Sequence, residues 1–340
     1  MESGIRAAVI GAGQIAQRGH LPGYAQMGVE LAALCDSANP ELETVAAKYQ
    51  IKRVYRDWKE MLTAGGFDVV SICTPPFLHC DMTVEALRRG YHVLVEKPMA
   101  MNLTECDLMI EAAQQSGRLL MVSANQRFIA AHQLAKSILD SGELGRLYLI
   151  HGVFGHSGPE VWSPTQTWYF QRERAGQGVI SDLGYHKLDL ICWMAGQALD
   201  RISAFAGTFE KATSLEDSAV FSFQLSRGTL GTLQVSWVFR PDWENSLVLR
   251  CERGVIRVPT EATDPLRVLR LDPQGRVAES EHYIQTQDTS GWFGAIQAFV
   301  NAVQTGKPSP VSGAEGKAAL AAVLAAGQAI VESRVVTLGS

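Results

Sequence analysis

The stretch from 176 to 193 holds three ionisable side chains whose spacing suits acid–base chemistry. Asp182, His186 and Asp189 stand at i, i+4 and i+7, so they share one stripe of an expected helix, and apolar residues fill the neighbouring stripe. A carboxylate one turn from an imidazole can hold one ring nitrogen and raise the basicity of the other. The pattern predicts a proton acceptor, with an ordinary ion pair on a helix surface as the alternative.

A lysine and a glutamate follow another expected element. Glu96 and Lys97 come directly after the buried strand predicted at 91–95, where charged side chains are poor core residues. Pro98 restricts the backbone of Lys97. We interpret Lys97 as an ammonium group positioned at a binding edge, rather than as a lysine that reaches solvent over its own apolar stem.

The element that positions a ligand for these groups is the stretch from 5 to 16, IRAAVIGAGQIA. A short apolar run rich in β-branched residues predicts a strand, and the residues after Gly13 predict a helix. Gly11 permits a sharp turn, and Gly13 lets a phosphate approach the first free N–H groups of the helix. Ala16 replaces the third glycine of the usual fingerprint and still allows close packing. We predict dinucleotide contacts from Gly11, Gly13, Gln14 and Ile15.

Asp36 ends the second predicted strand, 29–35, about where the acidic residue of a dinucleotide site is expected. Its carboxylate can accept the ribose hydroxyls and would repel the extra phosphate of NADP. The residues 37–39 include no arginine to receive that phosphate, so NAD is favoured over NADP. Alone, Asp36 could equally be a turn residue before the next helix.

Strand and helix patterns alternate up to residue 124, which predicts a doubly wound parallel sheet with crossover helices, a Rossmann domain over 1–124. Among its helices we expect one over 104–116 with Thr104 as its N-cap. The loop 74–79 follows a buried strand at the edge where such sheets bind ligands. We predict that Thr74, Pro75, Glu96 and Lys97 line the cofactor. His79 either faces the cofactor or caps the helix that follows.

From 125 to 340 the pattern changes to longer strands with few helices between them, which predicts a second, α+β domain for substrate binding and oligomerisation. The segments 218–226 and 232–239 alternate with period two and predict an antiparallel hairpin. Its outer face carries neutral polar residues rather than charges, so it either contacts another subunit or is simply solvated. Two C-terminal helices are expected, over 292–304 and 312–332.

The composition excludes several classes of protein. The chain has 340 residues, a formal net charge of −5 and mixed charges throughout, so neither a nucleic-acid groove nor a membrane-surface patch is indicated. Its six cysteines form no C-x-x-C pair, which favours buried thiols in a reducing cytosol over disulfides or a metal site. No signal peptide is evident, and no segment approaches the ~20 apolar residues of a membrane span. We expect a soluble cytoplasmic protein without metal.

Several motifs together resemble the Gfo/Idh/MocA family of nicotinamide-dependent oxidoreductases, which includes inositol dehydrogenases and glucose–fructose oxidoreductase. They are G-A-G-Q-I-A, Asp36, T-P-P-F-L-H, E-K-P-M-A, N-Q-R-F and D-L-G-Y-H-K-L-D. The resemblance implies a Rossmann domain followed by a domain with a large, mostly antiparallel sheet, and a Lys97–Pro98 bond that is often cis. It identifies Lys97 as the catalytic lysine, Asp182 and His186 as the catalytic pair, and Asp189 as a substrate contact. Gln177 departs from the pattern, since many members have glycine there.

The resemblance also implies a mechanism and a substrate class. Hydride would pass between NAD and a secondary alcohol or ketone of a sugar, inositol or related polyol. His186 would accept the hydroxyl proton, Asp182 would orient its ring, and Lys97 would donate to the oxygen. We add Asn125, Arg127 and Trp168 as substrate contacts. The aromatic loop 162–174 could stack on a sugar, or belong to the core or a dimer contact, and Arg127, Arg172 and Arg174 could bind an anionic group or form surface ion pairs.

Two other functions remain open at this stage. One is a sensor that binds NAD without turnover, and the other is a glycosidase that uses bound NAD for transient oxidation and elimination. The intact set of Lys97, Asp182 and His186 counts against the sensor. We expect a homodimer or homotetramer that forms through the sheet face of the second domain.

Overall fold

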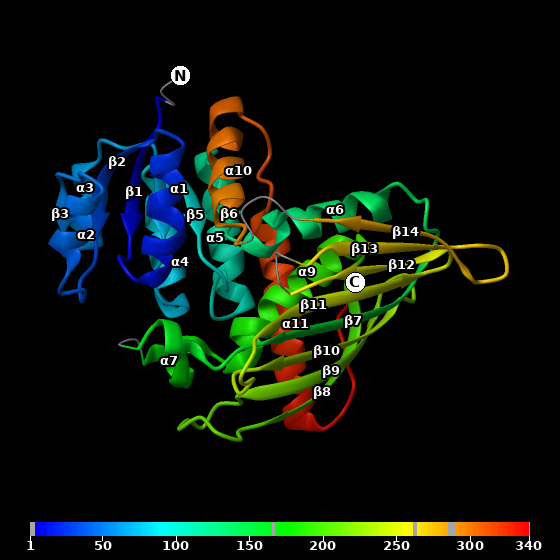
Figure 1. Cartoon of the computed structure of the whole chain (residues 1–340). Coiled ribbons are helices and arrows are strands. Elements are labelled where there is room, and N and C mark those ends of the chain that lie inside the picture. The colour runs from blue at the N-terminus through cyan, green and yellow to red at the C-terminus, as the bar shows by residue number, and fades with distance from the viewer. Residues whose placement is uncertain (1–3, 165–166, 261–263, 285–289, 340) are drawn as a thin grey trace. The chain divides into compact units, whose positions relative to one another are not determined.

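The computed structural model describes residues 4–164, 167–260, 264–284 and 290–339. The chain forms two compact units (Figure 1): Met1–Asn125 with Trp292–Lys317, and Gln126–Gly291 with Ala318–Ser340. The sequence analysis placed all residues after 124 in the second domain, whereas 292–317 pack in the first unit. The reason is a direct attachment to the parallel sheet, where the Val122 N–H donates to Val311 O at 3.1 Å.

The first unit is built on a six-stranded parallel sheet in the order β3-β2-β1-β4-β5-β6. This order confirms the predicted Rossmann arrangement and reverses beside β1, where such sheets bind ligands at the carboxyl ends of their strands. The short β3 was not predicted. The strands are β1 (Arg6–Ile10), β2 (Glu30–Cys35), β3 (Val54–Tyr55), β4 (Val69–Ile72), β5 (His92–Val95) and β6 (Leu120–Val122).

Local signals explain where several helices of the first unit begin and end. Asp57 caps α3 by accepting the Lys59 N–H, and Gly117 ends α5 in the left-handed conformation. The N-cap of α5 is Asn102, not Thr104 as predicted, because the Asn102 side chain accepts the Glu105 N–H. The helices are α1 (Leu21–Gln26), α2 (Leu42–Lys48), α3 (Trp58–Ala64), α4 (His79–Arg88), α5 (Leu103–Ser116) and α10 (Trp292–Thr305).

Two glycines in the first helical segment allow the C-terminal helix α10 to pack closely. A Cβ added to Gly19 would lie 3.0 Å from the Trp292 ring, and one added to Gly23 would lie 2.9 Å from Ile296. Both distances are shorter than an ordinary side-chain contact. The glycines of this segment therefore make room for a helix that lies 273 residues further along the chain, the separation of Gly19 from Trp292 and of Gly23 from Ile296.

The second unit contains a nine-stranded sheet in the order β14-β13-β12-β11-β7-β10-β9-β8-β15. Only β7 and β10 pair in parallel, so the sheet is mostly antiparallel, as expected. The predicted hairpin is confirmed as β9 and β10. The strands are β7 (Leu147–Gly155), β8 (Leu199–Gly207), β9 (Ser218–Leu225), β10 (Leu230–Ser236), β11 (Glu244–Cys251), β12 (Gly254–Val258), β13 (Leu266–Leu271), β14 (Val277–Tyr283) and β15 (Val336–Thr337).

Helices cover one face of this sheet. Among them, α9 packs on β7 and α6 packs on β12. The other face exposes Phe205, Val220 and Leu230, together with neutral polar side chains and arginines such as Arg201 and Arg250. The helices are α6 (Ala130–Asp140), α7 (Pro159–Trp162), α8 (Arg172–Ala175), α9 (Tyr185–Ala195) and α11 (Gly313–Glu332), of which α11 begins in the first unit and ends in the second.

The long helix α11 corrects one expectation from the sequence. Within the part of the chain that the structure describes, it is long and apolar enough to span a membrane by length and composition, a test that core helices also pass.

In the second unit the Gln177 side chain lies where a Cβ on Gly327 would be, and its amide donates to Val323 O at 3.4 Å. Gln177, which stands where many members of the family have glycine, therefore contributes a side-chain contact with α11.

Candidate active site

The glycine turn after β1 has the geometry that a pyrophosphate site requires. Gly11 has a φ of +93°, and a Cβ added there would lie 2.7 Å from the carbonyl of Cys73 at the end of β4. The helix begins at Gln14, and its first N–H groups have no acceptor within the helix. Gly13, Gln14 and Ile15 thus form a helix N-terminus that suits an anion. These residues fit NAD.

The Asp36 carboxylate joins the two turns at the ends of β1 and β2. One oxygen accepts the Ala12 N–H at 2.8 Å, and the other accepts the N–H groups of Ala38 and Asn39, also at 2.8 Å each. All three donors are neutral, so the side chain keeps its negative charge at the turn. This charge would favour ribose hydroxyls over a phosphate.

An arginine lies near this turn, although the residues 37–39 contain none. Arg56, which follows β3, donates to Asn39 O at 2.6 Å and forms an ion pair with Glu43 at 2.8 Å. Sequence reasoning missed it because β3 was not predicted. Since Glu43 already balances its charge, Arg56 adds little that would attract the extra phosphate of NADP.

His79 is fully buried, and both of its ring nitrogens lie near backbone carbonyls. Nε2 is 2.7 Å from Thr74 O and Nδ1 is 2.9 Å from Pro98 O. Burial lowers the pKa of His79. The imidazole therefore joins the Thr74–Pro75 loop to the turn after β5, and this geometry corrects its assignment as a cofactor contact, because no ring nitrogen remains for a ligand.

The Glu96 carboxylate is buried at the end of β5, while Lys97 is half-buried. His20 Nε2 lies 2.9 Å from Glu96 Oε1, and the Lys97 N–H donates to Glu96 Oε2 at 3.3 Å. Burial alone would raise the pKa of Glu96, but hydrogen bonds from His20 and Ser123 and the charge of Lys97 hold it below its usual value. The Lys97–Pro98 bond is cis. Lys97 therefore lies next in the chain to the buried, charged carboxylate of Glu96.

Sequence reasoning missed His20 altogether. The only available signal was a histidine within an apolar helical segment, which does not reveal its partner. In the structure His20 is 1% exposed and lies between Glu96 and Ser71.

The second unit carries Asp182 and His186 on a helix that begins irregularly. Ile180–Gly184 form a π-helical turn, and the regular helix α9 starts at Tyr185. Asp182 and His186 are therefore not spaced by one regular turn, as the sequence analysis assumed, because a π turn contains more residues. Asp182 is buried, whereas His186 is half-buried and its ring centroid lies 5.9 Å from that of Phe154.

Asp182 has a buried donor that the sequence did not suggest. Trp237, which follows β10 and is fully buried, donates its indole N–H to Asp182 Oδ2 at 3.1 Å. The Trp237 backbone N–H in turn donates to Asp217 O at 2.7 Å. The carboxylate is thus held from a neighbouring strand rather than only from its own helix.

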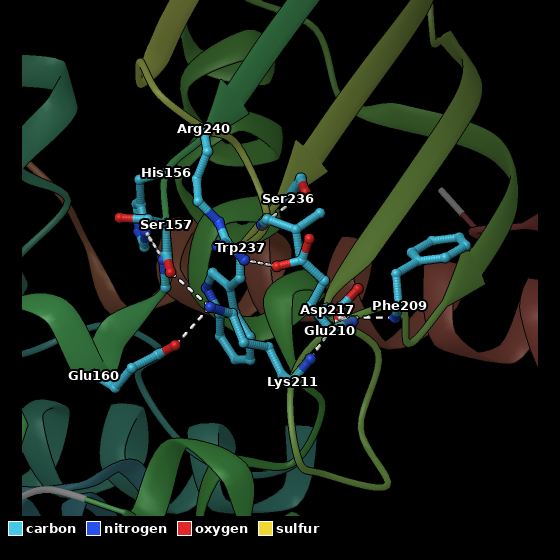
Figure 2. A network of polar contacts seen from close by, with 12 residues as sticks. His156, Ser157, Glu160, Phe209, Glu210, Lys211, Asp217, Ser236, Trp237 and Arg240 are labelled. Carbon is cyan, nitrogen blue, oxygen red and sulfur yellow. Dashed lines mark hydrogen bonds and ion pairs between the residues drawn. The ribbon is translucent and has the colours of Figure 1, made fainter.

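Figure 2 shows the polar network around Trp237. Lys211 donates to Ser157 O at 2.6 Å and to Glu160 at 2.5 Å, which ties the 208–217 loop to α7. The fully buried Asp217 shapes that loop by accepting three backbone N–H groups, those of Phe209, Glu210 and Lys211. The segments beside Trp237 are therefore cross-linked by charged side chains, of which Asp217 is fully buried and Glu160 is partly exposed.

The aromatic loop lies against this network. Trp168 and Tyr169 stack with ring centroids 3.7 Å apart, and Phe170 packs edge-on against Trp237 at 5.7 Å. Residues 165–166 of the predicted loop lie outside the described residues. Arg172 and Arg174 are exposed on α8. Trp168 is half-buried, so part of its ring can contact a ligand.

Arg127 and Asp189, both predicted to bind substrate, bind each other. Arg127 Nε lies 2.8 Å from Asp189 Oδ2 and Nη2 lies 2.5 Å from Oδ1, and both side chains are buried. A bidentate pair of this kind joins the segment before α6 to α9. We therefore interpret both residues as part of the support of α9 rather than as primary substrate contacts. Asn125 is half-buried just after β6.

Lys187 is an unexpected buried charge next to His186. It is fully buried, and its Nζ donates to Ser246 O at 3.2 Å. Burial lowers its pKa to about 7, although the charge of Glu244 acts in the opposite direction. Burial and the Lys187 charge together lower the pKa of His132 to about 3.

The fold and these residues define a nicotinamide-dependent oxidoreductase, and comparison with protein families agrees. Residues 5–124 match the model of the oxidoreductase family with an NAD-binding Rossmann fold, and residues 132–257 match that of the GFO/IDH/MocA C-terminal domain. The chain belongs to the Gfo/Idh/MocA family. It is an enzyme of the dehydrogenase class, and its cofactor is NAD.

Individual relatives extend over nearly the whole chain. D-glucoside 3-dehydrogenase of Escherichia coli is 29% identical over 92% of this chain and 91% of that protein. Myo-inositol 2-dehydrogenase of Thermotoga maritima is 23% identical over 91% of each. A solved levoglucosan dehydrogenase, in complex with NADH and levoglucosan, superposes with a TM-score of 0.87 at 21% identity, covering 99% of this chain and 100% of that one. The last similarity shows the shared fold.

The charge of Asp36 predicts a preference between cofactors. We expect Asp36→Ala to raise the Kd for NAD about ten- to a hundredfold, since a hydrogen bond to a charged group contributes about 1.5–3 kcal/mol. The Kd for NADP should rise less or fall, because the repulsion of its phosphate disappears. Asn39→Ala is the control: it removes the amide bond to Ala12 O at 2.8 Å and should affect both cofactors equally. Fluorescence titration measures both, and an equal loss in Asp36→Ala would contradict the ribose assignment.

The buried Lys187 predicts a pH-dependent stability. Its folded-state pKa of about 7 lies below the ordinary lysine pKa of 10.5, so between these values the unfolded chain binds the proton more strongly and stability rises with pH. Lys187→Met should therefore raise the thermal midpoint most at and below pH 7, about where the folded-state penalty is complete, and the gain should shrink toward pH 10. Calorimetry at several pH values measures this difference, and a gain independent of pH would contradict it.

Proposed function

We propose that the protein transfers a hydride between NAD and a secondary alcohol or ketone of a sugar, an inositol or a related polyol. The observation that carries the proposal is Lys97, which follows a buried, charged Glu96 at the carboxyl edge of the NAD-binding sheet. An ammonium group there can donate to a substrate oxygen on which negative charge develops.

The proposed chemistry divides between the two units. When bound, NAD supplies C4 of its nicotinamide as the hydride acceptor. His186 accepts the hydroxyl proton, and its half-buried ring remains reachable by a ligand. Asp182, held by the Trp237 indole at 3.1 Å, orients that ring and stabilises its protonated form. Lys97 donates to the oxygen and favours its negative charge.

The names of the relatives support a sugar or polyol as substrate, since a glucoside, an inositol and levoglucosan all offer a secondary hydroxyl on a ring. In the second unit, the exposed part of Trp168 gives such a ring a surface on which to stack. We propose Lys97, Asn125, Trp168, Asp182 and His186 as substrate contacts.

Two other functions are less well supported. A sensor without turnover would not require Lys97, Asp182 and His186 together. A glycosidase that oxidises its substrate transiently would return the hydride and would form no net NADH. A screen of inositols, hexoses, glycosides and uronates, followed by the absorbance of NADH, separates these functions from a dehydrogenase.

We expect Lys97→Ala and His186→Ala each to lower kcat about 10²–10⁴-fold, the usual contribution of a positioned acid or base. The Kd for NAD should change less than about threefold, because neither side chain forms the pyrophosphate or ribose site. The exposed Lys52→Ala is a control that should retain turnover. Steady-state kinetics with the best substrate of the screen measures kcat, and full turnover in both variants would remove the proposed roles.

We also propose that two or four copies associate through the open face of the second sheet. Phe205 is 83% exposed there and Val220 is 50% exposed, and in the register of β8 and β9 they lie side by side. Large exposed apolar side chains that lie side by side on one face of a sheet are typical of a subunit contact. The free cysteines favour a reducing compartment, so we place the assembly in the cytoplasm.

Charge introduced into that face should separate the copies. We expect wild-type protein to have the mass of a dimer or tetramer in light scattering, and Val220→Glu to shift it toward the monomer. Val331→Glu, at an exposed valine on α11, is the matched control and should keep the assembly. A monomeric wild-type protein would contradict the proposal.

A further inference from the structure

A continuous set of buried hydrogen bonds ends on the carboxylate next to Lys97. The Tyr24 hydroxyl lies 2.8 Å from Ser71 Oγ, Ser71 Oγ lies 3.0 Å from His20 Nδ1, and His20 Nε2 lies 2.9 Å from Glu96 Oε1. None of the four residues is more than 6% exposed. They come from the first helical segment, from β4 and from the end of β5, so hydrogen bonds connect three elements to the Glu96 carboxylate.

One arrangement of protons satisfies the whole set. Burial raises the pKa of Tyr24, so its hydroxyl keeps its proton and can donate to Ser71. The Ser71 hydroxyl can then donate to His20 Nδ1, and an N–H at Nε2 can donate to Glu96. Each group gives one hydrogen bond to the next, and the last acceptor is the charged carboxylate.

An irregular turn of the helix places His20 in this set. Ala16–His20 form a π-helical turn that is closed by the Leu21 N–H donating to Ala16 O. A π turn inserts an extra residue, which rotates the following side chains relative to a regular helix by about 100°. The turn therefore determines which side of the helix His20 occupies, and Gly19 beside it leaves room for Trp292.

Several titratable groups of the first unit influence Glu96. His20 and Lys97 stabilise its charge, and Glu96 in turn acts on Cys73 and His79. Burial raises the pKa of Cys73 well above its usual value and lowers that of His79, so neither group brings a charge at neutral pH. The buried charge of Glu96 thus depends on donors, of which His20 is one.

We propose that His20 is a positioning residue: it holds the Glu96 carboxylate, which accepts the Lys97 backbone N–H, and so fixes the turn that carries the ammonium group of Lys97. The inference rests on the proposed function, because it assigns His20 a role only through Lys97. His20 itself touches neither substrate nor NAD in this proposal.

His20→Phe tests the proposal by replacing the imidazole with a ring that cannot donate. The effect of burial then dominates at Glu96, so loss of this hydrogen bond should raise the pKa of Glu96. We expect kcat to fall about tenfold at neutral pH, the effect of one such bond on a rate, with little change in the Kd for NAD. The acid limb of the kcat/KM profile should gain a second ionisation.

Three further variants separate positioning from simple destabilisation. His20→Gln carries an amide N–H that can reach the position of Nε2 and should restore the wild-type profile. In His20→Phe with Glu96→Gln the second ionisation should disappear, because the titrating group is gone. Leu21→Ala, at the next and equally buried residue, should lower the thermal midpoint without adding an ionisation.

The outcomes distinguish this inference from the proposed function. If Lys97→Ala abolishes turnover but His20→Phe keeps the wild-type pH profile, or if His20→Gln is as impaired as His20→Phe, the positioning role of His20 is wrong. If Lys97→Ala retains full turnover, the proposed function fails first, and His20 then has no group to act on. A second ionisation that persists after Glu96→Gln would also overturn the inference.

Discussion

A negative charge buried at the carboxyl edge of a parallel sheet must be balanced by donors that come from other elements, because its own strand has none left to offer. Glu96 is that charge here. Its donors are His20, from the first helix, Ser123, just after β6, and the N–H of Lys97. The strand order β1-β4-β5-β6 brings these elements together. The Rossmann topology therefore does more than bind a dinucleotide, since it also makes a buried carboxylate possible next to a lysine.

In the second unit, the buried carboxylate of Asp182 likewise needs a donor from another element. That carboxylate is buried at the start of α9, and a donor from the end of β10, the Trp237 indole, holds one oxygen at 3.1 Å. Trp237 is fixed in turn through its backbone by Asp217. In both units a candidate ionisable group is held by a buried partner that is distant in sequence, while the group proposed to act on the substrate, Lys97 or His186, stays half-buried.

What the sequence predicted well depends on neighbouring residues. The glycine turn, the Asp57 cap and the β9–β10 hairpin follow from local chemistry. The misses depend on partners that a single sequence does not reveal. Arg127 and Asp189 are 62 residues apart and bind each other, and α10 returns to the first unit through contacts with Gly19 and Gly23. For the same reason neither His20 nor Trp237 was predicted, although the elements that carry them were.

The two π turns explain a subtler error. The sequence analysis assumed 3.6 residues per turn, so it placed Asp182, His186 and Asp189 on one stripe. In the structure Ile180–Gly184 form a π turn, so the spacing of Asp182 and His186 departs from that of a regular helix, and Asp182 also accepts a hydrogen bond from Trp237 of its own unit. The other π turn, Ala16–His20, directs His20 to Glu96. A π turn weakens helix geometry and persists where tertiary contacts compensate. Here each one contains a residue in a buried hydrogen bond that involves a carboxylate, His20 with Glu96 and Asp182 with Trp237, and those bonds are the compensation.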